Sequence, residues 1–367
     1  MGIKQIAKRG VKPGKYDTES KDDAEIRSLL EAKKTKIKII GCGGAGNNTI
    51  TRLMEVGVVG AETIAINTDA QDLLYTDADK KILIGKELTR GLGAGANPSL
   101  GMEAARETKQ ELEQALRGSD MVFMTCGLGG GTGTGSIPVV AEIAKRAGAL
   151  TVAVVTLPFA MEGKQRMSNA REGLKNLEGI ADTMIIIPND RLLEIVPDVS
   201  IITAFKIADE ILVNAVKGIT ELVTKPGLVN LDFADVRAVM GGSGMAMIGM
   251  GESDTENRAF EAVERALNNP LLAVDIEGAT GALINVTGGP GITMREAYQI
   301  VEAVSTKLAP DAKIIWGAQV EEDFGDRIRA LLIVTGVKTQ QIFSGEKSGA
   351  KRSKKDLEYM LGVDFIE

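Results

Sequence analysis

The chain has no histidine and only two cysteines among its 367 residues. The absence of imidazole excludes every mechanism that needs a histidine as general base, general acid or metal ligand. Cys42 and Cys126 occupy positions that are expected to be buried, and their number does not indicate a disulfide framework. Any catalysis must therefore depend on carboxylates, backbone dipoles, hydroxyl groups, cationic side chains or a metal carried by a ligand.

Aromatic residues, long apolar runs and excess positive charge are also scarce. Aromatics make up 4% of a chain that is 44% hydrophobic, so the core must be aliphatic and rich in glycine and alanine. No apolar run approaches the ~20 residues of a membrane-spanning helix, and the N-terminus lacks a signal-peptide pattern. The net charge of −7 argues against nucleic acid as the main partner. We expect a cytoplasmic protein without direct membrane insertion.

Short apolar runs typical of buried strands alternate with helical patterns over the first half of the chain. Such alternation predicts a doubly wound, mostly parallel α/β sheet. The strands are expected at residues 36–40, 63–67, 81–84, 120–125, 150–156 and 183–188. The helices between them are expected from about residue 48 and over residues 99–117, 136–147 and 162–178.

A long apolar pattern of helical period, Ile201–Thr224, indicates a mostly buried central helix. After a loop at Leu228–Asp235, a second alternation of strands and helices predicts a smaller C-terminal α/β domain. The glycine-rich segment Gly241–Gly244 is expected to form a turn before its first strand. The strands are expected at residues 245–251, 281–287, 313–319 and 328–335, and the helices at 255–268 and 293–308.

The segment Gly41–Asn47 joins the first strand to its helix and matches the pattern G-x-G-x-x-G. Glycines there let backbone N–H groups approach a phosphate, and the helix N-terminus adds a favourable dipole. Asp69 ends the second strand, where a dinucleotide-binding protein places its ribose-binding acid. An NAD(P)-dependent oxidoreductase is therefore one interpretation. The candidate ligand-binding residues of the segment are Gly43, Gly44, Ala45, Gly46 and Asn47.

The segment Leu128–Gly135 has the sequence LGGGTGTG and follows another strand. Its five glycines exclude a core element, because a glycine inside a helix costs about 1 kcal/mol relative to alanine. The composition fits a nest of N–H donors around phosphate oxygens, with two threonine hydroxyls as further donors. No lysine follows in the position of a Walker P-loop. The candidate residues are Gly129, Gly130, Gly131, Thr132, Gly133 and Thr134.

A third segment, Gly91–Pro98, has the sequence GLGAGANP and offers further N–H donors through Ala94, Gly95 and Ala96. It suits contact with a terminal phosphate through the backbone and metal-bound water. All three segments lie at the carboxyl ends of strands, where open α/β sheets bind ligands. Three such loops fit a triphosphate better than the single pyrophosphate of a nicotinamide cofactor.

Together these loops resemble the tubulin/FtsZ superfamily, and the sequence is similar to its FtsZ family of prokaryotic cell-division GTPases over about residues 36–340. The resemblance implies GTP and GDP as ligands. It also implies Mg²⁺ held mainly by phosphates and water, with no metal site made by the protein. Thr156–Phe159 and Glu162–Arg166 look like the family's ribose-contacting loop and helix start.

The same resemblance implies roles for five residues beyond the glycine loops. Glu162 and Asn189 would contact the ribose, and Arg166 would lie near the sugar and phosphates. Phe205 would stack on guanine, and Asp209 would accept hydrogen bonds from two N–H groups of the base. The spacing of four residues puts Phe205 and Asp209 on one helix face, as that interpretation requires.

Asn230, Asp232 and Asp235 lie in the loop after the central helix. From the residues alone, Asp232 is a cap or turn residue. The resemblance implies instead that this loop reaches the nucleotide of a neighbouring subunit, where its acids position the attacking water. The central helix would carry the loop ~30 Å across the domain, to the face opposite the segment Gly129–Gly135. The loop of one subunit could then meet the GTP of the next in a head-to-tail contact, which leaves open ends and propagates into a filament. A non-hydrolysing scaffold is a further alternative, against which both acids argue.

The expected organisation has five parts. They are an N-terminal extension (1–35), a GTP-binding domain (36–200), the central helix and catalytic loop (201–236), a C-terminal α/β domain (237–340), and a flexible linker with a terminal peptide (341–367). The peptide Asp356–Glu367 mixes acidic and apolar residues, which predicts either a peptide that folds on binding or a helix that docks on the parent domain. The resemblance implies a membrane-linked adaptor, of archaeal type, as its partner, and concentration of the protein at the division site.

Overall fold

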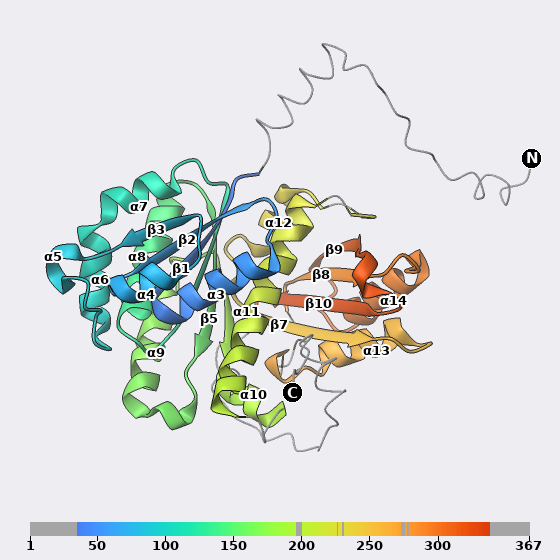
Figure 1. The fold of residues 1–367 in the computed structure, drawn as a ribbon. Helices are drawn as coiled ribbons and strands as arrows, with labels where there is room; N and C mark the ends of the chain where they lie inside the picture. Colours follow the sequence, from blue (N-terminus) through green and yellow to red (C-terminus); the bar gives the residue numbers. More distant parts are fainter. Residues whose placement is uncertain are drawn as a thin grey trace, which may run out of the picture. The chain divides into compact units, whose positions relative to one another are not determined.

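A computed structural model describes residues 35–195, 200–225, 227–229, 231–272, 276 and 279–337. From Lys36 onward these residues form one ten-stranded sheet with helices on both faces (Figure 1). The expected N-terminal extension, the linker, the terminal peptide and Asn230 lie outside the described residues.

The first six strands are parallel and lie in the order β3-β2-β1-β4-β5-β6, which confirms the predicted doubly wound sheet. The chain reverses its direction of winding between β1 and β4, and a crevice forms at such a switch point. Both strands end in a predicted glycine segment. The strands are β1 (Ile37–Cys42), β2 (Ala61–Asn67), β3 (Lys80–Leu83), β4 (Met121–Gly127), β5 (Leu150–Leu157) and β6 (Thr183–Pro188).

Helices cover both faces of this sheet, each through its own apolar cluster. Ile40 and Met124 face a cluster that includes side chains of α6, α7, α8 and α9, whereas Ile39 and Phe123 face α3, α11 and α12. The N-terminal helices are α3 (Gly43–Val56), α4 (Ala70–Tyr75), α5 (Lys86–Thr89), α6 (Pro98–Glu107), α7 (Lys109–Leu116), α8 (Thr132–Arg146), the 3₁₀ turn η1 (Ala160–Glu162), α9 (Lys164–Leu177) and α10 (Asn189–Ile195).

Several predicted helix boundaries were wrong in ways that matter for the glycine segments. The helix expected from residue 48 begins at Gly43, and the helix expected from residue 136 begins at Thr132. Tertiary packing outweighs the low helix propensity of glycine here, because Gly46 approaches β4 so closely that an added Cβ would lie 2.5 Å from the Thr125 carbonyl oxygen. The helix expected at 99–117 is interrupted at Thr108. The short helices α4, α5 and α10 were not predicted.

The central helix α11 (Ile201–Thr224) has the predicted bounds, and its N-terminus is capped by Ser200, whose Oγ accepts the Thr203 N–H at 3.1 Å. The sequence prediction missed α12 (Phe233–Met240), which begins inside the expected loop. The Asp232 N–H donates to Asp235 Oδ2 at 3.3 Å, so these residues shape the start of α12.

The C-terminal strands continue the same sheet, because β6 pairs in parallel with β7. Strand β10 lies between β7 and β8 and is antiparallel to both, while β8 and β9 are parallel. The glycine-rich segment before β7 forms the predicted turn. The elements are β7 (Gly244–Ser253), α13 (Arg258–Leu267), η2 (Pro270–Leu272), β8 (Gly281–Gly288), α14 (Met294–Ser305), β9 (Lys313–Val320), η3 (Glu322–Phe324) and β10 (Ile328–Thr335).

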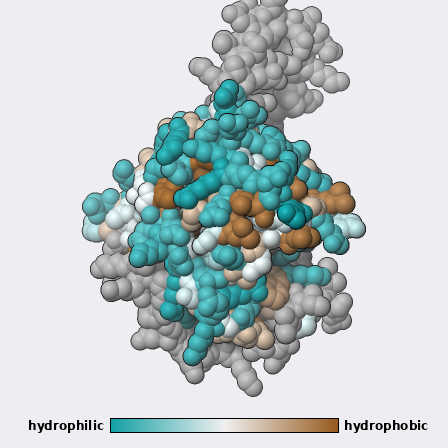
Figure 2. All heavy atoms as spheres, turned by 90° about the vertical axis from the view of Figure 1, so that its left-hand side faces the viewer, coloured by the Kyte–Doolittle hydropathy of each residue, from teal (hydrophilic) through white to brown (hydrophobic). Residues whose placement is uncertain are grey.

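One face of the molecule, seen in Figure 2, is mostly hydrophilic and is interrupted by separate hydrophobic patches. Among the residues that the structure describes, no helix combines the length and apolar character needed to cross a membrane.

Candidate functional site

The first two glycine segments meet at the switch point between β1 and β4. Gly43 has a φ of 70°, and a Cβ added to it would lie 2.8 Å from the backbone nitrogen of Gly133. Neither α3 nor α8 has a side chain that caps its N-terminus. The first turn of a helix leaves its N–H groups without partners in the helix, and these groups attract anions. Two such helix ends therefore lie side by side at one point of the sheet edge.

The third segment packs directly on the second. A Cβ added to Gly131 would lie 2.8 Å from the Asn97 nitrogen and 2.9 Å from the Ala94 Cβ. Ala96 has a φ of 57°, a left-handed conformation that is uncommon outside glycine. Within the segment Ala94 is buried, whereas Gly95 and Ala96 are exposed. The structure therefore brings all three glycine segments together.

The two threonines of the second segment differ in their surroundings. The Thr132 hydroxyl lies 2.6 Å from that of Thr68, at the end of β2. Thr134 is buried, and its Oγ1 accepts the N–H of Gly129 at 2.9 Å, so it shapes the loop from within. Sequence reasoning missed Thr68, although its position directly after a strand of the ligand-binding edge was a usable signal.

Asp69 lies beside this edge and caps a helix. Its Oδ1 accepts the N–H groups of Gln71 at 2.9 Å and Asp72 at 3.1 Å. A Cβ added to Gly93 would lie 3.8 Å from the other carboxylate oxygen of Asp69. The side chain thus caps α4 beside the third glycine segment.

Two buried amides that follow strands of the sheet, Asn47 and Asn189, have polar atoms without partners in the described part of the chain. Asn47 is 1% exposed, and neither its Oδ1 nor its Nδ2 forms a hydrogen bond within the described part of the chain. The same holds for Oδ1 of Asn189, at the start of α10. A buried polar group without a partner costs about 1–3 kcal/mol. These amides therefore fit a polar ligand that supplies the missing hydrogen bonds.

The predicted ribose and base residues lie around the N-terminal part of α11. Phe205 is 41% exposed, and its ring meets Phe159 edge to face at 5.2 Å. Glu162 accepts the Phe159 N–H at 2.8 Å and forms an ion pair with Arg166 at 3.0 Å. Burial, with a smaller contribution from Glu210, raises the pKa of Asp209 from 3.8 to about 7. An exposed ring and a carboxyl group with a raised pKa therefore lie one helical turn apart on α11.

The predicted catalytic acids lie apart from these residues within one chain. Asp232 and Asp235 are exposed and follow the C-terminal end of α11, which at 24 residues is about 36 Å long. Figure 1 shows α10, which begins where β6 ends, and α12 at opposite ends of α11. The structure does not bring the two aspartates to the glycine edge of the same chain.

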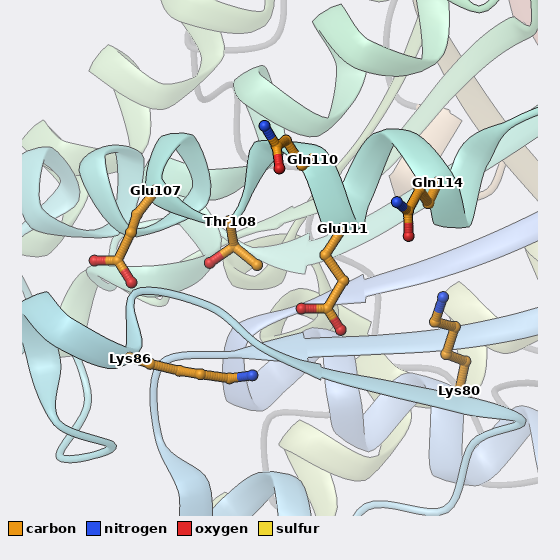
Figure 3. A pocket seen from close by; sticks show the side chains of 7 residues that line it. All are labelled: Lys80, Lys86, Glu107, Thr108, Gln110, Glu111 and Gln114. Atoms are coloured by element: carbon orange, nitrogen blue, oxygen red, sulfur yellow. The ribbon is translucent and has the colours of Figure 1, made fainter.

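Two polar hollows lie away from the glycine edge. The larger, of about 550 Å³, is formed by side chains of β3, α5, α6 and α7 (Figure 3). The smaller, of about 70 Å³, separates α11 from C-terminal strands and is lined by Lys217, Glu221, Asn285 and Arg329 among others. Neither hollow includes a residue of the three glycine segments. The residues around the larger hollow are Lys80, Lys86, Glu107, Thr108, Gln110, Glu111 and Gln114.

Both cysteines are buried and free. Burial raises the pKa of Cys42 to about 12 and that of Cys126 well above its usual range. Because the thiolate is the reactive form, neither side chain is a candidate nucleophile.

Two family models match the chain. Residues 36–197 match the Tubulin/FtsZ family, GTPase domain, and residues 244–338 match the FtsZ family, C-terminal domain. These matches support guanine nucleotide binding and give the oxidoreductase alternative no support.

Similar proteins and structures come from archaea. The chain is 60% identical to "Cell division protein FtsZ 1" of Methanocaldococcus jannaschii over 338 residues, which is 92% of each chain. It is 55% identical to "Cell division protein FtsZ" of Methanothermobacter thermautotrophicus, covering 100% of this chain and 97% of that protein.

Among solved structures, "FtsZ dimer, empty (M. jannaschii)" is 62% identical, has a TM-score of 0.83, and covers 87% of this chain and 93% of that chain. The structure "CetZ2 from Haloferax volcanii - GTPgS bound protofilament" shares the fold at 23% identity, with a TM-score of 0.72 over 84% of this chain and 95% of that chain. The sequence matches over most of the length, together with the two family models, show that the chain belongs to the FtsZ family of cell-division GTPases.

Proposed function

We propose that this chain binds GTP at the edge between β1 and β4, assembles head to tail with copies of itself, and hydrolyses GTP at the contact between subunits. The observation that carries this proposal is the contact of two uncapped helix N-termini at Gly43 and Gly133, with the third glycine segment packed against them. Their N–H groups suit the oxygens of a polyphosphate.

The nucleotide would lie along the carboxyl ends of the strands. The segment Gly43–Asn47 and the residues Thr132–Thr134 would hold the inner phosphates, and Ala94–Ala96 together with Gly129–Gly131 would hold the terminal phosphate. Mg²⁺, held mainly by phosphate oxygens and water, would neutralise phosphate charge. The residues proposed for the ribose and base are Asp69, Glu162, Arg166, Asn189, Phe205 and Asp209.

Asp209 suits guanine because the base presents two adjacent N–H donors where adenine does not. An ionised carboxylate accepts both hydrogen bonds, and hydrogen bonds to charged groups contribute about 1.5–3 kcal/mol each. Phe205, on the same face of α11, offers an exposed ring for stacking.

Hydrolysis would be completed by a neighbouring subunit. Asp232 and Asp235 are exposed at the end of α11 away from the glycine edge, so a head-to-tail contact would bring them to the GTP of the next chain. There, with Asn230, they would position the attacking water. Backbone N–H groups of the glycine segments would bear the charge that develops on the terminal phosphate.

Exposed apolar side chains near the glycine edge and near the C-terminal end of α11 support such a contact. Leu92 and Met161 are 84% and 67% exposed near the glycine edge. Leu228 and Val320 are 60% and 41% exposed beyond the C-terminal end of α11. Two different surfaces on one chain make a heterologous contact, which propagates into a filament. A relative at 62% identity has been solved as a dimer, which also supports self-association.

The rate of hydrolysis tests the shared site. We expect phosphate release per chain to rise steeply with protein concentration, because each active site needs two subunits. The measurement is phosphate release over a range of protein concentrations, with sedimentation of polymer in GTP and in GDP. A rate strictly proportional to concentration, well below and well above the onset of sedimentation, would contradict hydrolysis in trans.

The affinity for GTP should rise with pH up to about pH 7. Burial raises the pKa of Asp209 to about 7, whereas guanine requires the ionised carboxylate. Below that pH, binding must release a proton, which costs up to about tenfold in affinity per pH unit. By the same linkage, the nucleotide-free chain should lose stability as the pH rises from about 4 to 7, because the folded state favours the protonated acid.

Titration of GTP against the parent protein and an Asp209→Asn variant at several pH values checks this expectation. Ionisation of the phosphates affects both proteins equally, so the difference between the two pH profiles reports Asp209. Identical pH profiles for the two proteins would show that GTP binding does not require ionisation of Asp209.

The remaining parts of the proposal concern organisation in the cell. We propose the five-part division at residues 35, 200, 236 and 340, with Asp356–Glu367 binding a membrane-linked adaptor. The protein would then be cytoplasmic and concentrated at the division site.

A further inference from the structure

Asn169 is a buried side chain of α9 that is bonded to two of the glycine segments. It is 7% exposed. Its Nδ2 donates to the carbonyl oxygens of Ala96, at 3.2 Å, and Gly129, at 3.3 Å. Its Oδ1 accepts from Nε2 of Gln165, one turn earlier on α9, at 3.0 Å. Each polar atom of the amide is therefore engaged, and a single side chain ties the second and third glycine segments to one helix.

The two carbonyl groups that it binds belong to unusual backbone. Ala96 adopts a φ of 57°, which is unfavourable for a residue with a side chain and persists only where the surroundings enforce it. Gly129 adopts a φ of 105°, and a Cβ added to it would lie 2.8 Å from the Arg166 carbonyl oxygen on α9. The hydrogen bonds from Asn169 thus act where the backbone needs external support.

These bonds also orient a donor. The carbonyl and the N–H of one trans peptide unit point in opposite directions. Holding the Gly129 carbonyl toward Asn169 therefore directs the N–H of Gly130 away from α9. A Cβ added to Gly130 would meet nothing within 4 Å, so this residue borders open space.

We propose that Asn169 is a positioning residue that fixes Gly91–Pro98 relative to Gly129–Gly131, so that both segments present N–H groups to the terminal phosphate of GTP at the same time. This inference rests on the proposed function. Asn169 acts through the loops and does not touch the nucleotide. Because Gly91–Pro98 serves the terminal phosphate, which GDP lacks, loss of Asn169 affects GTP more than GDP.

The test compares the affinities of the full chain for GTP and GDP, measured by competition with a fluorescent guanine nucleotide below the concentration of assembly. Asn169→Ala should bind GTP about tenfold more weakly and GDP within about twofold of the parent, since the terminal-phosphate contact alone is loosened. The GTP hydrolysis rate should fall as well. A purely structural role would weaken GTP and GDP binding equally.

Asn269→Ala is the matched control. Asn269 is 1% exposed, and its amide likewise bonds two backbone groups, the Met250 carbonyl at 2.8 Å and the Leu271 N–H at 2.9 Å. It lies between α13 and η2, outside the glycine segments, so this variant should lose stability but keep the ratio of GTP to GDP affinity.

Two further substitutions keep the test decisive if Asn169→Ala folds poorly. Asn169→Gln retains both donors and should recover part of the GTP preference, whereas Asn169→Leu, which fills similar space without donors, should not. An unchanged affinity ratio in Asn169→Leu, or in a folded Asn169→Ala, overturns the positioning role. A parent protein that binds neither GTP nor GDP would instead overturn the proposed function.

Discussion

Replacing Asp235 with alanine should leave GTP binding close to that of the parent and reduce GTP hydrolysis at least about 100-fold, the scale of a lost water-positioning group. Asp235 is exposed, and its carboxylate accepts a weak 3.3 Å bond from the Asp232 N–H at the start of α12, so the fold should survive the change. Nucleotide binding and phosphate release are the two measurements. Asp77→Ala, another exposed aspartate, is the control and should retain both.

Mixing variants tests whether the acid acts on a neighbouring chain. Asp235→Ala retains its own GTP site, but it presents only Asp232, without Asp235, to the GTP of its neighbour. Asp209→Asn should bind little GTP but keeps both loop aspartates. A mixture of the two should hydrolyse GTP faster than the sum of the separate samples, because mixed contacts combine an intact nucleotide site with an intact loop. Rates that merely add would exclude complementation between subunits, and full hydrolysis by Asp235→Ala alone would remove this residue from the site.

Replacing Asp209 with asparagine should weaken GTP binding about 100-fold and create affinity for XTP. A carboxamide offers one acceptor and one donor, so one guanine N–H loses its partner and faces another donor. Losing a charge-assisted hydrogen bond and leaving a buried donor unpaired together cost about 2–3 kcal/mol, which is the stated factor. Xanthine carries a carbonyl group where guanine carries the amine, so it matches the carboxamide.

Competition of GTP and XTP against a fluorescent guanine nucleotide measures this change of specificity. Glu210→Gln is a close control, because the neighbouring acid is directed to Arg52 and forms an ion pair with it. That variant should change the GTP affinity less than about threefold, as a partly exposed ion pair contributes little. If Asp209→Asn discriminates between GTP and XTP as the parent does, Asp209 does not bind the base.

The sequence predicted the fold with few errors because its signals were local and strong. Buried parallel strands are short aliphatic runs that end in glycine, and the 24 residues of α11 carry an apolar pattern long enough to define both ends. The errors fell where tertiary contacts outweigh propensity. Because of their glycines, the first turns of α3 and α8 were not predicted to be helical, whereas the close approach of Gly46 to β4 favours glycine inside the first turn of α3.

Some features of the candidate site could likewise be predicted from the sequence, whereas others depend on tertiary contacts. The glycine segments could be found from composition, because no other role explains so many glycines at the ends of strands. Their mutual contacts could not, since the packing of Gly131 on Ala94 joins loops that are separated by more than one element of structure. Thr68 was missed although it directly follows a strand of the glycine edge, and only the structure shows its contact with Thr132. Asn169 was missed because a single asparagine inside a helix carries no pattern, and its role depends on a partner distant in sequence.

By itself, the sequence determined the class of the molecule: it predicted a doubly wound sheet, a family resemblance that the comparisons support, and a candidate edge for binding a polyphosphate. The tertiary structure decided, within the described residues, which helix N-termini lack a side-chain cap and which buried amides form no hydrogen bond, and that Asp232 and Asp235 lie at the other end of α11 from the glycine edge. The physical reason is that strand and helix periodicity is written in neighbouring residues, whereas burial and hydrogen bonding depend on segments that meet only when the whole sheet has formed.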